Sequence, residues 1–211
     1  MSDNNIETKV VRIGLLGDSK VGKSAICRAF TGLEFITEGV TTIGSDKFEK
    51  KIILNGGKEI KLILWDTAGQ ERFRSAAFKT IKSVHGIALV FDVSNKETFS
   101  NINLWLEDIK DNFVDPCLIL FGNKTDKPKE EWEITQDEIN SFIKGKNLPY
   151  YETSAKLNKG IDEGLAHIAN DAFEKIEKTK KKPDGKNKNI NINNNQASKK
   201  QKCCYILYNI F

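Results

Sequence analysis

The chain has 211 residues, 39% of them hydrophobic and 29% charged, with a net charge of +4, which suits one soluble domain with a substantial core. No apolar run reaches the roughly 18 residues of a membrane-spanning helix, and no basic, apolar leader opens the chain, so we expect a cytosolic protein. Its four cysteines lack metal-ligand spacing, which argues against a zinc site and against a disulfide framework.

Strand-like and helix-like segments alternate along residues 9 to 177, which predicts an α/β fold with helices on both faces of a mostly parallel sheet. We predict strands at Val10 to Leu16, Lys50 to Leu54, Lys61 to Trp65, Ile87 to Phe91, Cys117 to Phe121 and Tyr150 to Glu152. We predict helices at Lys23 to Phe30, Phe99 to Asp111, Gln136 to Lys144 and Ile161 to Ile176. The turn signal Asn55-Gly56-Gly57 indicates a hairpin, so one edge strand of the six-stranded sheet should be antiparallel.

A glycine-rich loop follows the first strand and opens the first helix. Its residues match the pattern GxxxxGK[ST] and are Gly17, Asp18, Ser19, Lys20, Val21, Gly22, Lys23 and Ser24. In such a loop backbone N–H groups surround a phosphate, and the helix N-terminus adds positive potential. We therefore expect residues 19 to 25, through Ala25, to bind phosphate, with Lys23 reaching the β- and γ-phosphates and Ser24 binding Mg²⁺.

The segment Trp65 to Glu71 follows the third strand, where a γ-phosphate sensor should lie. We expect Asp66 to hold Mg²⁺ through water and the Gly69 N–H to bond the γ-phosphate. Gln70 is the predicted catalytic residue, because phosphoryl transfer needs a positioned water more than a strong base.

Two later loops favour guanine as the base. Asn123, Lys124 and Asp126 follow the central strand, and a carboxylate such as Asp126 can accept from both the N1–H and the exocyclic amine of guanine. The stem of Lys124 would pack over the base. Ser154, Ala155 and Lys156 follow the last strand, where backbone N–H groups can meet the guanine carbonyl oxygen.

In chain order, GDSKVGKS, Thr42-Ile43-Gly44, WDTAGQE, NKTD and ETSAK resemble the motif set of the Ras superfamily, and most of all its Rab family. The likeness extends from about Val10 to Ile176. It implies the P-loop NTPase fold of small GTPases, binding of GTP or GDP with Mg²⁺, and slow hydrolysis in a switch that recruits effectors in membrane traffic. It also implies that Thr42, eighteen residues after Ser24, binds Mg²⁺ in the GTP state and that Phe35 packs against guanine.

The resemblance further implies a monomer that meets an exchange factor, a GTPase-activating protein, a GDP-dissociation inhibitor and effectors, and does not bind nucleic acid. Gly39 stands where relatives commonly carry a tyrosine, so looser closure over the phosphates and faster exchange are a hypothesis. Of the aromatic triad that contacts Rab effectors only Trp65 is kept. A GTP-binding scaffold without hydrolysis and a P-loop kinase or ATPase remain alternatives.

The chain divides into a flexible N-terminus (1 to 8), a GTPase domain (9 to 177) and a disordered basic tail (178 to 211). Between Lys178 and Lys202 the tail has nine lysines and one acidic residue, which suits a membrane surface. Cys203 and Cys204 are candidates for double geranylgeranylation, which would let the protein cycle between cytoplasm and the cytosolic face of an endomembrane. The apolar residues Tyr205 to Phe211 depart from the family's ending, so unmodified thiols, or an apolar segment that touches the membrane, stay open.

Overall fold

The computed structural model describes residues 9–36, 45–68 and 74–180. Six strands in these ranges form one sheet in the order β2-β3-β1-β4-β5-β6. Their bounds are β1 (Lys9–Leu16), β2 (Ser45–Ile53), β3 (Glu59–Thr67), β4 (Gly86–Asp92), β5 (Cys117–Asn123) and β6 (Tyr150–Glu152). β2 pairs antiparallel with β3, and the other neighbouring pairs are parallel. The predicted sheet with one antiparallel edge strand is confirmed.

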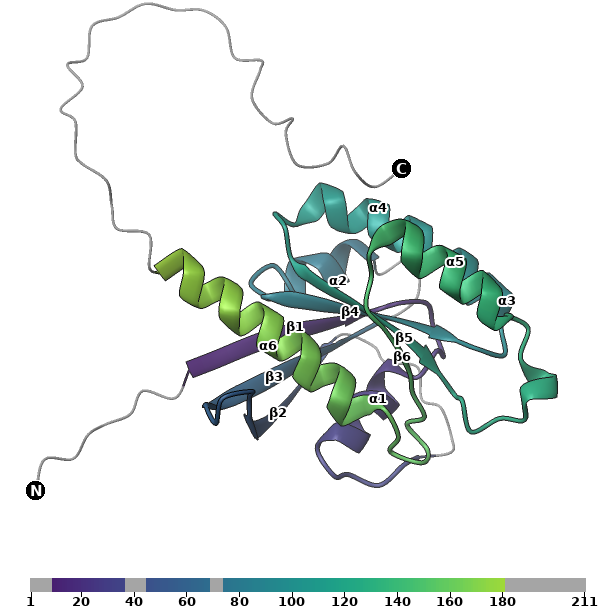
Figure 1. The fold of residues 1–211 in the computed structure, drawn as a ribbon, viewed down its shortest axis with the longest axis horizontal. Coiled ribbons are helices and arrows are strands. Elements are labelled where there is room, and N and C mark those ends of the chain that lie inside the picture. The colour runs from purple at the N-terminus through teal and green to yellow at the C-terminus, as the bar shows by residue number, and fades with distance from the viewer. Residues whose placement is uncertain (1–8, 37–44, 69–73, 181–211) are drawn as a thin grey trace, which may run out of the picture.

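Helices cover both faces of this sheet (Figure 1). On one face lie α1 (Lys23–Phe30) and α6 (Ile161–Lys180). On the other face lie α2 (Arg74–Thr80), α3 (Lys96–Ser100), α4 (Ile102–Asn112) and α5 (Gln136–Lys146). A short 3-10 turn, Lys129–Glu131, precedes α5.

The central strand β4 shows why its sequence is a continuous apolar run. Ala88 and Val90 contribute to the core beneath α1 and α6, whereas Ile87, Leu89 and Phe91 contribute to the core on the opposite face. Because successive side chains point to opposite faces and both faces are covered, every position in β4 is buried.

The hairpin is longer than the sequence predicts. β2 and β3 pair from Ser45↔Thr67 to Ile53↔Glu59. Gly56 and Gly57 form its turn at φ of 81° and 75°, a conformation that glycine adopts without a steric cost. The strands extend beyond the predicted apolar stretches because their ladder continues through charged, exposed residues of the edge strand.

Three helical predictions need correction. The helix predicted at Phe99 to Asp111 is two helices, α3 and α4, that meet at Asn101. α3 begins earlier than predicted because the side chain of Asn95 caps it, accepting from the N–H groups of Glu97 and Thr98. The helix α2 was not predicted. α6 continues to Lys180, past its predicted end at Ile176.

Candidate functional site

The glycine-rich loop joins β1 to α1 in a tight turn. Three of its residues have left-handed backbone, with φ of 142° at Gly17, 64° at Lys20 and 100° at Gly22. A Cβ on Gly17 would lie 2.1 Å from the Val90 carbonyl oxygen, and a Cβ on Gly22 would lie 2.3 Å from Asn123 Nδ2. Glycine is therefore required at both positions, because a side chain would displace β4 or β5.

The ammonium group of Lys23 lies inside this loop. The residue is 5% exposed, and its Nζ donates to the carbonyl oxygens of Gly17 at 2.8 Å and Asp18 at 2.7 Å. Burial lowers the pKa of Lys23 to about 8, against the opposing effects of Asp66 and Asp18. Gly22 precedes α1 without a side-chain cap. A buried cation beside a helix N-terminus suits a phosphate group.

Ser24 and Asp66 meet where Mg²⁺ is expected. Ser24 Oγ donates to Asp66 Oδ2 at 2.5 Å, and Asp66 is 1% exposed at the end of β3. A hydroxyl and a carboxylate are hard oxygen ligands, and Mg²⁺ is usually bound by one or two carboxylates together with phosphate and water. These two residues therefore fit Mg²⁺ next to the phosphate loop.

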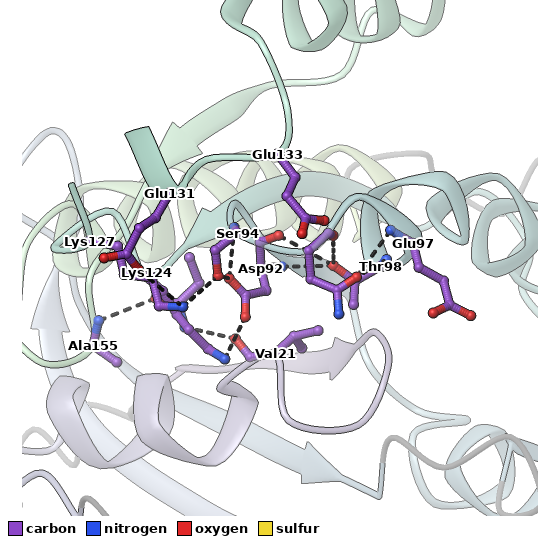
Figure 2. Close-up of polar contacts among 12 residues, drawn as sticks. Val21, Asp92, Ser94, Glu97, Thr98, Lys124, Lys127, Glu131, Glu133 and Ala155 are labelled. Carbon is purple, nitrogen blue, oxygen red and sulfur yellow. Dashed lines mark hydrogen bonds and ion pairs between the residues drawn. The ribbon is translucent and has the colours of Figure 1, made fainter. Parts of the chain in front are cut away.

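Asn123 connects the phosphate loop to both base loops. It is 1% exposed, and its Nδ2 donates to the Val21 carbonyl at 2.9 Å. Its Oδ1 accepts from the Ala155 N–H at 3.2 Å and from Thr153 Oγ1 at 3.3 Å. Figure 2 labels two of these partners, Val21 of the phosphate loop and Ala155 of the loop after β6. The role of Asn123 follows from these contacts: it holds three loops in register.

Asp126 is oriented by the neighbouring loop. Ser154 Oγ donates to Asp126 Oδ1 at 2.7 Å and accepts from the Leu157 N–H at 3.1 Å. The Thr125 N–H bonds the Thr153 carbonyl at 3.1 Å. The structure therefore brings Asp126 and Ser154 together, as the base-recognition prediction requires.

Lys124 forms an ion pair that the sequence did not reveal. Its Nζ lies 2.6 Å from Asp92 Oδ2, and Asp92 Oδ1 accepts from the N–H and the Oγ of Ser94. Lys127 Nζ donates to the Ser94 hydroxyl at 2.7 Å. Lys124 therefore contacts Asp92 and Lys127 contacts Ser94, as Figure 2 shows. Burial alone would raise the pKa of Asp92, but Lys124 and Ser94 outweigh it and lower the pKa. The sequence signal that could have pointed to Asp92 is its position, since it is the acidic last residue of the otherwise apolar strand β4.

Asp18 ties the phosphate loop to α4. Its Oδ1 accepts from Trp105 Nε1 and its Oδ2 from Asn101 Nδ2, both at 2.8 Å. Sequence reasoning assigned Asn101 and Trp105 no role in the site, because their partner is more than 80 residues away in the chain. This contact holds the outer side of the loop against the helix.

The remaining predicted residues vary in exposure. Phe35 is 42% exposed beyond the end of α1, so its ring is available to a ligand and is not part of the core. Lys156 is exposed, while Ser19 and Ala25 are half-buried in the phosphate loop and in α1. The other predictions lie outside the described residues: Gly39, Thr42, Gly69, Gln70, Cys203 and Cys204.

Comparison with known proteins matches residues 11–174 to the Ras family. The chain is 38% identical to the Ras-related protein SEC4 of Saccharomyces cerevisiae, over 92% of this chain and 91% of that protein. It is 34% identical to the Ras-related protein RAB1BV of Beta vulgaris, over 92% and 93%. It is 33% identical to the Ras-related protein Rab-18 of Lymnaea stagnalis, over 97% and 98%.

Proposed function

The chain belongs to the Ras family, and from this membership we propose which of its residues bind and hydrolyse GTP. With its Rab relatives it is a GTPase switch of vesicle traffic that binds GTP or GDP with Mg²⁺. A scaffold without hydrolysis is not favoured by these relatives. The observation that supports the residue roles is the convergence of the loops after β1, β3, β5 and β6 at one edge of the sheet.

The phosphates are bound by the loop between β1 and α1. Backbone N–H groups from Ser19 to Ala25 surround them, and Lys23 exchanges its two carbonyl partners for phosphate oxygens. Ser24 binds Mg²⁺ directly, and Asp66 holds it through water. Thr42 and the Gly69 N–H complete this set in the GTP state. Mg²⁺ neutralises charge on the β- and γ-phosphates.

Guanine is recognised by the loops after β5 and β6. Asp126, oriented by Ser154, accepts from the base. The backbone N–H groups of Ala155 and Lys156 face its carbonyl oxygen. Lys124 and Phe35 cover the two faces of the ring.

Gln70 orients the water that attacks the γ-phosphate. The motif Trp65 to Glu71 contains no arginine, and we expect an activating protein to supply the positive charge that stabilises the transition state. Regulators and effectors are expected partners of a Rab protein, here an exchange factor, an activating protein, a GDP-dissociation inhibitor and effectors. The protein acts as a monomer and does not bind nucleic acid.

The protein cycles between the cytoplasm and the cytosolic face of an endomembrane through its basic tail. None of the described helices is long and apolar enough to cross a bilayer. Geranylgeranyl groups on Cys203 and Cys204 would supply the anchor, since stable attachment needs two signals. Intact mass and membrane fractionation of wild type and the Cys203→Ser/Cys204→Ser variant test this; an unmodified wild-type chain on membranes would refute the lipid anchor.

Single-turnover hydrolysis tests the catalytic assignment. We expect Gln70→Ala to lower the hydrolysis rate at least about tenfold, because a misplacement of reacting groups by about 1 Å can cost roughly a hundredfold in rate, with GDP and GTP affinity unchanged. Competition by excess ATP should leave bound GTP in place. Wild-type turnover in Gln70→Ala would remove Gln70 from the mechanism, and no turnover in the wild type would restore the scaffold alternative.

A further inference from the structure

A pocket lies at the end of the sheet opposite the phosphate and base loops. It encloses about 570 Å³, within the range of roughly 300–1,000 Å³ that is typical of ligand pockets. His85 and Pro116, which line it, directly precede β4 and β5, and Lys180 on its rim is the last residue of α6. Nothing in the nucleotide mechanism uses this pocket.

The lining of the pocket combines an apolar surface with polar and charged side chains. Val84, Phe113, Val114, Pro116 and Ile176 contribute the apolar surface. Val114, at 100% exposure, presents its whole side chain to solvent. The lining also carries the basic side chains Lys82, Lys175 and Lys180 and one acidic side chain, Asp115.

The walls of the pocket are held in place. Lys175 of α6 forms an ion pair with Asp115, whose backbone is left-handed at φ 50°. Beneath them, the Cys117 N–H bonds the His85 carbonyl at 3.2 Å, and the Arg12 N–H bonds His85 Nδ1 at 3.0 Å. The pocket is therefore preformed, which reduces the ordering cost of binding a ligand.

We propose that the chain's own segment Tyr205–Phe211 docks into this pocket. The segment carries two tyrosines, a phenylalanine, a leucine and two isoleucines and no charged side chain, so it matches the apolar lining. The chain leaves α6 at the pocket rim, with Lys180 in the lining. A recessed apolar surface between a helix and a loop can also hold a peptide better than it can contact a flat lipid surface.

The length of the connection makes weak docking sufficient. Residues 181–204 form a link of 24 residues, and a coil of that length has an r.m.s. span of roughly 27 Å. The effective concentration of the segment is then about 1 mM, so a pocket affinity of about 0.1 mM leaves roughly nine in ten chains docked. The docked segment is unavailable to a membrane, and Cys203 and Cys204, which precede it, are held next to the domain.

Amide NMR spectra of the GDP-bound full chain, made without lipid modification, test the docking. Ending the chain after Cys204 should shift amides of the pocket, those of Val84, Val114 and Ile176 among them. A synthetic Tyr205–Phe211 peptide added to the shortened chain should restore the original positions. Unchanged spectra on truncation, or shifts on another surface, would overturn the proposal.

Matched variants separate docking from unfolding. Val114→Asp in the full chain should reproduce the shifts caused by truncation and weaken the peptide at least tenfold, and Leu207→Asp should do the same from the tail side. Ile53→Asp, a change at an apolar side chain that is 72% exposed outside the pocket, should have no such effect. Two other outcomes would replace the proposed occupant. Pocket shifts that grow with protein concentration would indicate that a second copy of the chain occupies the pocket. Pocket shifts in the shortened chain on adding vesicles of acidic phospholipid would indicate that a membrane surface occupies it. Because GDP is bound throughout, neither outcome bears on the nucleotide-binding roles.

Discussion

Lys124 Nζ lies 2.6 Å from Asp92 Oδ2, which joins the end of β4 to the base loop that follows β5. Lys124 has left-handed backbone at φ 68°, a strained conformation for a residue with a side chain. The carboxylate, itself held by Ser94, therefore fixes the direction in which the Lys124 stem leaves the loop. If Lys124 covers the base as proposed, Asp92 is a positioning residue that acts through Lys124.

Asp92→Asn should release GDP about tenfold faster, because it weakens one charge-assisted hydrogen bond worth about 1.5 kcal/mol. Stopped-flow dissociation of a fluorescent GDP analogue measures this rate. Glu49→Gln is the matched control, since Glu49 is likewise an ion-paired carboxylate, with Lys47 and Lys61 as partners, but lies on the exposed edge strand. Equal rates for wild type and Asp92→Asn would show that Lys124 needs no such partner.

Asp126→Asn should lower GTP affinity at least about a hundredfold, because the amide cannot accept both hydrogen bonds from guanine. The same amide can donate to the second carbonyl of xanthine, so the variant should gain affinity for xanthosine triphosphate. Equilibrium titration with both nucleotides measures the exchange. Ser154→Ala removes the donor that orients Asp126 and the acceptor of the Leu157 N–H but keeps the Asp126 carboxylate. It should weaken GTP binding without any gain in affinity for xanthosine triphosphate; such a gain would contradict the assignment.

The sequence predicts the nucleotide loops because each is a contiguous motif after a strand. Ser24 and Asp66, predicted as neighbours at the Mg²⁺ site, meet at 2.5 Å, since the parallel strands β1 and β3 end at the same edge. For Asp126 and Ser154 the same reasoning holds across β5 and β6. Strand order alone brings these motifs together.

Supporting contacts between distant segments were not predictable in this way. The bonds from Asn101 and Trp105 to Asp18 depend on how α4 packs against the phosphate loop, which no local pattern encodes. The α2 helix, seven residues long, is too short for a clear helical period. The cap at Asn95, by contrast, has a sequence signal, because asparagine before a helix is a preferred N-cap.

Gly22→Ala should destabilise the protein more than Gly32→Ala, although both glycines have left-handed backbone. At Gly32 an added Cβ meets nothing within 4 Å, so only the backbone penalty of about 1–2 kcal/mol applies. At Gly22 the Cβ would push Asn123 away from Val21 and Ala155. Thermal unfolding together with GDP titration should show lost GDP binding only in Gly22→Ala; equal losses in both variants would leave the Asn123 contact without a role.

Glu138 makes the stability of the N-terminus of α5 depend on pH. The hydrogen bond from Lys96, followed by those from Thr135, lowers the pKa of Glu138 from 4.5 to about 2. Thr135 and Glu138 also form the capping box of the helix. A carboxylate with a lowered pKa in the folded state stabilises fully above its unfolded value and loses that contribution as pH falls from 4.5 towards 2.

Glu138→Gln should therefore lower the melting temperature at pH 7. The difference in melting temperature from wild type should narrow at pH 3.5, because protonation of Glu138 then removes its stabilising charge from the wild type as well. Asp137→Asn is the matched control: it removes a neighbouring carboxylate in the first turn of α5, outside the capping box. At pH 7 it should lower the melting temperature less than Glu138→Gln does, because it removes no hydrogen bond of the capping box. A Glu138→Gln difference that is the same at pH 7 and pH 3.5 would mean that the charge of Glu138 does not stabilise the start of α5.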